Sequence, residues 1–238
     1  MMRSILIAAF LLAQPLAAQT FTVVHEKKLW RDGYGKVVIS EAGISYVAED
    51  EKESREWKYG DIQYFDRISQ SEFAILSYED SRRWLGRDKS YHFRIVGAEL
   101  SDEVFGRIAG RLNRPLTNRV VPGKIDAVYV LPVKHQHAFG GCEGELRFTG
   151  EAIYYVTDHR EDAREWRLDR DVQSVWSADP YRLEIHAYDD NRREFSRSRV
   201  YAFDLKRALD PEFYRKLKLA LYDLEVVHLP RKSTTRSR

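Results

Sequence analysis

The chain of 238 residues carries one pattern twice. The segment 35–47, GKVVISEAGISYV, recurs at 144–156 as GELRFTGEAIYYV, and the triplet Arg-Glu-Trp that ends at Trp57 recurs at Trp166. Both recurrences have a spacing of 109 residues (144 − 35 and 166 − 57). Self-similarity at a fixed spacing indicates a structural unit that is present more than once. The repeat therefore predicts two copies of one fold, and it constrains architecture more than function.

The repeated residues have the character of core and turn positions. Apolar residues alternate on both sides of the sequence Glu-Ala-Gly, as in a hairpin of two short strands. A tryptophan at the same point of each copy is expected to be a core residue, because one indole buries roughly 150 to 250 Å². The residues predicted to be structural are Gly35, Gly43, Trp57, Gly144 and Trp166.

Each copy is expected to end in a helix. In the first copy Ser101 can cap a helix whose apolar residues Val104 and Ile108 are spaced by four. In the second copy Asp210 can cap, and Pro211 suits the first helical turn because its missing N–H is not needed there. Each copy thus reads as six or seven short strands followed by one amphipathic helix.

This order predicts a mainly β chain with C-terminal helices, in which each copy is a small antiparallel barrel or sandwich capped by one helix. It resembles the pleckstrin-homology-like (PH-like) superfold in two tandem copies. The recurring residues also resemble an uncharacterised group of exported bacterial proteins, a resemblance that implies no activity. They are His25, Gly35, Gly43, Ile44, Tyr46 and Trp57, then His135, Gly144, Ile153, Tyr155 and Trp166.

The N-terminus has the order of a signal peptide: a positive start, a short apolar run and the small residues Ala17 and Ala18. The run is shorter than the roughly 18 residues of a membrane anchor, so we expect export to the periplasm or secretion, with no integral membrane segment after cleavage. Cleavage after Ala17 or Gln19 is an alternative. The predicted organisation is a signal peptide at 1–18, PH-like repeat 1 at 20–113, a linker at 114–126, PH-like repeat 2 at 127–226 and a basic, disordered tail at 227–238.

The charge pattern and the single cysteine argue against nucleic-acid binding and against an internal disulfide. The 39 basic and 37 acidic residues are interspersed, which is not the basic stripe of a nucleic-acid binder. Cys142 is the single cysteine, so no internal disulfide can form. Phosphoinositide binding is not expected either, because an exported protein would not meet these lipids. The basic residues around the first hairpin, which the second copy lacks, are Lys27, Lys28, Arg31 and Lys36.

The second copy holds the most suggestive polar constellation. His135 and His137 alternate along a predicted strand, so both imidazoles face the same side, and Cys142 follows in the next loop. Histidine and cysteine are common ligands of transition metals. The first copy keeps His25 but has Lys27 in the second place. We predict no cofactor, with His135, His137 and Cys142 as the candidates for a metal. The candidate ligand-binding residues are His25, Trp30, His135, His137 and Cys142.

No motif for a catalytic nucleophile, a zinc protease or a phosphate loop occurs in the chain. The sequence therefore favours an exported binding or scaffolding module of unknown ligand, without catalytic activity, whose partner is another protein. Two alternatives remain open. One is a metal-binding protein or metal-dependent enzyme centred on His135, His137 and Cys142. The other is a structural partner in a periplasmic assembly that uses strand edges or a groove between the copies.

Overall fold

The computed structural model describes residues 18–27, 31–81, 88–112, 114, 116–191 and 196–226. Three predicted features lie outside these residues: almost all of the signal peptide, the candidate ligand residue Trp30 and the basic tail 227–238.

The described chain is mainly β with two helices, as the sequence predicts. Two single-turn 3₁₀ helices precede and follow β4. The strands are β1 (Gln19–Glu26), β2 (Gly33–Ile39), β3 (Gly43–Ala48), β4 (Arg55–Lys58), β5 (Ile62–Arg67), β6 (Glu72–Asp80), β7 (Asp88–Ile95), β8 (Leu116–Asn118), β9 (Tyr129–Gln136), β10 (Gly141–Phe148), β11 (Ala152–Val156), β12 (Arg164–Arg167), β13 (Val172–Trp176), β14 (Arg182–Asn191) and β15 (Ser196–Leu205), and the helices are α1 (Asp102–Arg111) and α2 (Pro211–Val226).

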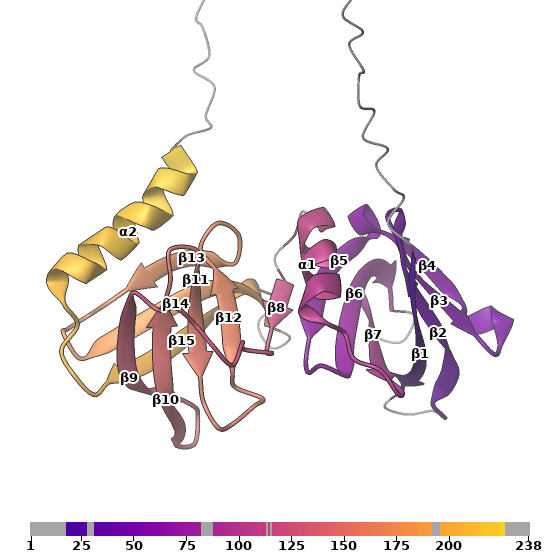
Figure 1. Cartoon of the computed structure of the whole chain (residues 1–238), viewed down its shortest axis with the longest axis horizontal. Coiled ribbons are helices and arrows are strands. Elements are labelled where there is room, and N and C mark those ends of the chain that lie inside the picture. The colour runs from indigo at the N-terminus through magenta and orange to yellow at the C-terminus, as the bar shows by residue number, and fades with distance from the viewer. Residues whose placement is uncertain are drawn as a thin grey trace, which may run out of the picture.

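The same strand order occurs twice. We call β1 to β7 with α1 the N-terminal half, and β9 to β15 with α2 the C-terminal half. Hydrogen-bonded neighbours run β5-β6-β7-β1-β2-β3-β4 in the N-terminal half and β13-β14-β15-β9-β10-β11-β12 in the C-terminal half. Figure 1 shows the two halves side by side, with β8 between them. The register also repeats, because Val37 pairs with Tyr46 as Leu146 pairs with Tyr155.

Each half buries its own cluster of apolar side chains. Trp57 is 1% exposed and Trp166 is 3% exposed. The Trp57 ring lies 4.8 Å from the Tyr91 ring at an angle of 61°, and the Trp166 ring lies 4.8 Å from the Tyr201 ring at 62°. Edge-to-face aromatic pairs of this kind add to the free energy of burial. The two tryptophans therefore have matching surroundings.

The recurring glycines are needed where neighbouring strands approach closely. A Cβ atom on Gly35 would lie 2.2 Å from the Val47 carbonyl oxygen, and one on Gly144 would lie 2.4 Å from the Val156 carbonyl oxygen. The repeat pattern suggests a turn at Gly43, but this residue begins β3, where a Cβ would lie 2.1 Å from the Trp57 carbonyl oxygen. At these positions the neighbouring strand leaves no room for a side chain, and this close approach is the reason for glycine. A left-handed backbone conformation is not the reason.

The segment predicted as a linker contains β8, a strand that joins the halves. Its residues pair in parallel with β5 from Phe65 to Arg67. On its other side Asn118 pairs with Glu165 of β12 in antiparallel fashion. A strand of three residues is too short for alternation to reveal it, and its partners lie far away in the sequence.

Both helices begin at the residues that the sequence indicates. The Ser101 hydroxyl accepts a hydrogen bond from the Val104 N–H, and the Asp210 carboxylate accepts from the N–H groups of Glu212 and Phe213. The buried Arg67 guanidinium also donates to Asp102 at the start of α1. In the part of the chain that the structure describes, neither helix combines the length and the apolar character that a membrane crossing requires.

Candidate functional site

Four potential metal ligands meet at one end of the C-terminal half. His135 lies on β9, His137 directly follows this strand, Cys142 lies on β10, and Asp162 lies in the turn before β12. One ligand atom each from His135, His137 and Asp162 lie within 4.8 Å of one another. The Cys142 Sγ lies 3.1 Å from Asp162 Oδ2, and the His137 Nε2 lies 3.3 Å from the same oxygen.

The hairpin of β9 and β10 brings these side chains together. Strand alternation places the His135 and His137 rings on one side, with their centroids 4.4 Å apart. The His137 N–H donates to the Gly140 carbonyl, and Gly140 has a φ of 85°, which reverses the chain. Cys142 is then paired directly opposite His135. Three of the four groups are therefore positioned by this hairpin, that is, by the two strands and the turn between them.

Electrostatics keep the inner histidine neutral. Burial, followed by the neighbouring His137, lowers the pKa of His135 from 6.5 to about 4. The hydrogen bond to Asp162 raises the pKa of Cys142. Among the described residues the buried Nδ1 of His135 has no hydrogen-bond partner, and the buried Nε2 of His137 lies 3.3 Å from Asp162 Oδ2 without forming a hydrogen bond. Two imidazole nitrogens and a carboxylate oxygen thus lie close together, and the Cys142 thiol lies against the same carboxylate.

Sequence reasoning found His135, His137 and Cys142 but missed Asp162. The stretch around Asp162 is charged, and the sequence therefore indicates only an exposed loop. The repeat carried a usable signal, because Asp162 stands 109 residues after Glu53 (162 − 53). Glu53 is also acidic and lies at the corresponding point of the N-terminal half.

The N-terminal half has an ion pair where the C-terminal half has the four ligands. Lys27 Nζ lies 2.5 and 2.6 Å from the two carboxylate oxygens of Glu53. His25 is the counterpart of His135, and burial, followed by Lys27, lowers the pKa of His25 to about 4. Gly33 is paired opposite His25, as Cys142 is paired opposite His135.

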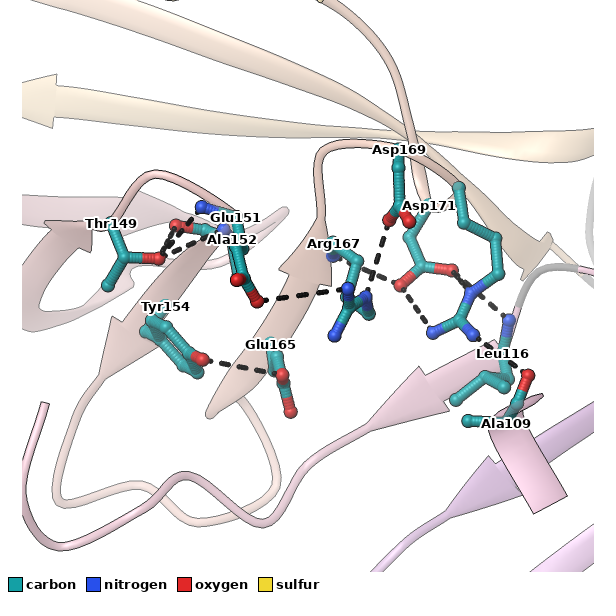
Figure 2. Close-up of polar contacts among 11 residues, drawn as sticks. Ala109, Leu116, Thr149, Glu151, Ala152, Tyr154, Glu165, Arg167, Asp169 and Asp171 are labelled. Atoms are coloured by element: carbon teal, nitrogen blue, oxygen red, sulfur yellow. Dashed lines mark hydrogen bonds and ion pairs between the residues drawn. The ribbon is translucent and has the colours of Figure 1, made fainter. Parts of the chain in front are cut away.

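A second feature is a cavity of about 230 Å³ at the junction of the halves. Apolar side chains of α1 and β8, among them Phe105 and Leu116, form one wall. The opposite wall carries Glu165, Arg167 and Asp171 from β12 and the turn after it (Figure 2). Burial raises the pKa of Glu165, whose carboxylate accepts a hydrogen bond from Asn118 of β8.

Asp171 is the polar centre of this junction (Figure 2). Its carboxylate accepts hydrogen bonds from the N–H groups of Arg167 and Leu116 and from the Arg170 guanidinium. Arg170 also donates to the Ala109 carbonyl at the end of α1. Asp171 is 2% exposed, and burial raises its pKa. Its contacts join the C-terminal half to both β8 and α1.

A buried polar cluster completes the junction. The Tyr64 hydroxyl on β5 donates to Asp189 Oδ1 on β14 at 2.5 Å, and Tyr201 donates to the other oxygen of the same carboxylate. Thr117 of β8 also donates to Asp189, at 3.1 Å. Burial alone would raise the pKa of Asp189, but the hydrogen bonds from Tyr201 and Tyr64 contribute to lowering it below its usual value. The N-terminal half is therefore joined to the C-terminal half through the Asp189 carboxylate and the hydroxyl groups that donate to it.

Comparison with known proteins gives structural likenesses and no match in sequence. The chain matches no protein-family model, and no curated protein matches it in sequence. The Vps36 N-terminal PH domain is similar at 15% identity and a TM-score of 0.33, over 44% of this chain and 86% of that chain. A structure of the Spt16D Pob3N heterodimer is similar at 12% identity and a TM-score of 0.27, over 72% of this chain and 84% of that chain. At these TM-scores neither likeness decides the fold or the function.

Proposed function

We propose that the protein is an exported, non-catalytic binding or scaffolding module made of two tandem PH-like units, at 20–113 and 127–226. Support comes from the identical order of seven strands in the two halves, each followed by one helix. The order of strands first and a single closing helix is that of the PH-like superfold. The ligand is another protein, and its docking surface is the free edge and outer face of β13.

The N-terminal half shows how such an edge is covered. Its strand β5 is paired by β8, and the Arg119 N–H donates to the Arg67 carbonyl at the end of this pairing. On the outer face of β5, the Tyr64 hydroxyl lies against the Thr117 hydroxyl, and Asp66 forms an ion pair with Arg119 at 2.6 Å. Asp66 is consequently 9% exposed.

The C-terminal half leaves the corresponding edge open, and this is the observation that carries the proposal. Phe65 and Asp66 of β5 correspond to Val175 and Trp176 of β13 at a spacing of 110 (175 − 65). Within the described residues β13 ends the sheet, with a neighbour on one side only. Trp176 is 49% exposed, although its counterpart Asp66 is covered.

Further apolar groups extend this surface. Tyr188 on β14 is 38% exposed and Val200 on β15 is 51% exposed. Both alternate with buried residues and therefore point to the outer face, as Trp176 does. Exposed aromatic and aliphatic side chains on one face are typical of interaction surfaces.

The occupant that fits is an extended segment of a partner protein. It would add to β13 as β8 adds to β5, with main-chain hydrogen bonds for affinity. Arg119, which directly follows β8, faces the Asp66 carboxylate. At the corresponding point the partner would present an apolar side chain to the Trp176 indole. Tryptophan is among the residues that most often dominate the binding energy of an interface.

The test combines capture with hydrogen exchange. Full-length protein would be used to capture partners from a cell-envelope extract, in parallel with the variants Trp176→Glu and Val47→Glu. Val47 is 56% exposed on β3 and serves as a matched control. We expect one partner to be retained by the wild type and by Val47→Glu but lost with Trp176→Glu, and we expect this partner to slow amide exchange in β13. Equal capture by both variants, or unchanged exchange in β13, would contradict the proposal.

A further inference from the structure

We propose that the C-terminal half binds one transition-metal dication of the Zn²⁺ type through His135, His137, Cys142 and Asp162. The proposal is independent of the protein-binding edge, because the cluster lies on β9, β10 and the turn before β12. It rests on the geometry of the four side chains and on the N-terminal half, where the corresponding place is taken by a lysine.

The distances suit a tetrahedral site. Metal bonds of about 2.0 to 2.3 Å place neighbouring ligand atoms about 3.3 to 3.5 Å apart. The separations from Asp162 Oδ2 are 3.3 Å to the His137 nitrogen and 3.1 Å to the Cys142 sulfur. His135 is 3% exposed, and its unpartnered Nδ1 belongs to the same group of side chains. His135, His137 and Asp162 already lie within 4.8 Å of one another, and rotation of the Cys142 side chain, which lies against Asp162, would complete the set of four ligands.

The Lys27 ammonium in the N-terminal half is the strongest support. It is a cation that lies beside a buried histidine and bonds to both oxygens of the carboxylate at the corresponding point. In the C-terminal half His137 stands in place of the lysine, so Asp162 has an imidazole beside it where Glu53 has an ammonium group. A free metal ion would restore the positive charge.

The residue paired opposite the buried histidine also differs between the halves, in a way that fits metal binding. Gly33 faces His25, and a Cβ atom there would lie 3.0 Å from the Glu53 carboxylate. Cys142 in the matching position reaches the Asp162 carboxylate with its sulfur. A bound dication, one thiolate and one carboxylate sum to zero charge, as the Lys27 and Glu53 pair does.

The chemistry of binding is a simple exchange. The dication takes the lone pairs of two neutral imidazoles, one carboxylate oxygen and the thiolate of Cys142, and the thiol proton is released to solvent. The thiol hydrogen bond to Asp162 is replaced by two metal bonds. Metal affinity should therefore rise with pH. Nitrogen, sulfur and oxygen donors together suit Zn²⁺ better than Mg²⁺ or Ca²⁺.

The site has four protein ligands, as structural zinc sites do, whereas catalytic sites keep one position open. The ion would tie the β9 and β10 hairpin to the turn before β12. Its expected effect is therefore on the stability of this end of the C-terminal half and not on a reaction.

The test is calorimetric titration of the full-length protein, freed of metal by a chelator, with zinc chloride. The informative variant is His137→Lys, which gives the cluster the residue of the N-terminal half and can pair with Asp162, so folding should be preserved. Asp162→Asn and Cys142→Ser remove single ligands. Lys27→Ala and His159→Ala are the controls. Lys27 belongs to the N-terminal half, and His159 is an exposed histidine in the turn that contains Asp162.

We expect one Zn²⁺ per chain for the wild type and both controls, and an affinity at least about 100-fold lower for His137→Lys and Asp162→Asn. With Co²⁺ as the probe, the wild type should show thiolate-to-metal absorption that disappears in Cys142→Ser. Circular dichroism of the metal-free variants checks that each one folds. Absence of stoichiometric binding, unchanged affinity in His137→Lys, or absence of the thiolate absorption would each overturn the proposal.

Discussion

The two ends at which His25 and His135 lie have the same scaffold and different chemistry. Each holds a buried histidine surrounded by aromatic side chains. The ring centroid of His25 lies 5.1 Å from that of Phe93, and the ring centroid of His135 lies 4.9 Å from that of Phe203. Beside this shared histidine, the N-terminal half closes with an ion pair of Lys27 and Glu53. The N-terminal half thus has an internal cation at the point where we propose that the C-terminal half takes up an external one.

A second contrast concerns the sheet edges. Strand β5 is covered by β8, whereas its counterpart β13 ends the sheet in the described part of the chain. The covered edge carries Asp66 and the open edge carries Trp176 at the corresponding position. The same strand therefore serves an internal contact in one half and is free for an external contact in the other.

The largest expected effect tests whether the two halves are built on equivalent cores. Trp57→Ala and Trp166→Ala should each lower the free energy of unfolding by about 3 to 5 kcal/mol, because each removes a buried indole and leaves a cavity. Chemical denaturation of the two variants measures this. A small loss for one tryptophan and a large loss for the other would break the equivalence of the halves.

The next effect is the pH dependence of stability that is due to His25 of the N-terminal half. Burial lowers the pKa of His25 from 6.5 to about 4, with Lys27, Glu53, His92 and Arg55 as the charged or titratable groups nearby. Between these two values the unfolded chain binds a proton that the folded chain does not, so stability falls as the pH falls from 6.5 to 4. The loss due to this histidine should reach about 3 kcal/mol.

The measurement compares unfolding of the wild type with that of His25→Phe at pH 7 and pH 4. Phenylalanine fits the aromatic surroundings but cannot take up a proton. The variant should lose less stability over this range than the wild type does. Identical losses would show that His25 is not the group responsible.

A smaller effect distinguishes the two corresponding aspartates Asp61 and Asp171. Asp171→Ala would leave buried N–H groups of Leu116 and Arg167 without their partner, so we expect a loss of about 2 kcal/mol. Asp61 accepts a hydrogen bond from the Lys58 N–H at an exposed position, and Asp61→Ala should cost about 1 kcal/mol or less. Equal losses in thermal or chemical unfolding would argue against a special role of Asp171 at the junction.

The smallest expected effect is a gain of zinc binding in the N-terminal half. Lys27→His with Gly33→Cys would copy the ligands of the C-terminal half and should add a second, weaker zinc site. It should be weaker because a Cβ at position 33 would lie 2.9 Å from the Tyr46 hydroxyl oxygen and must displace it. Calorimetric titration should then give two Zn²⁺ per chain, and Lys27→His alone serves as the control. A double variant that still binds one ion would show that more than these residues defines the site.

The sequence was sufficient where the signal is local. Strand alternation placed His135 and His137 on one face, and the repeat placed Trp57 and Trp166 at corresponding points. Asp162 could not be found in this way, because a charged turn looks like any solvated loop until the chain folds it onto β9. The three residues of β8 were missed for a related reason, since their pairing partners on β5 and β12 lie about 50 residues away in either direction.

Anomalous X-ray diffraction from crystals of the full-length protein grown with zinc tests the central comparison most directly. The account predicts one strong zinc peak within bonding distance of His135, His137, Cys142 and Asp162, and no peak beside Lys27 and Glu53. A peak at both places, at neither place, or only on surface histidines would contradict it.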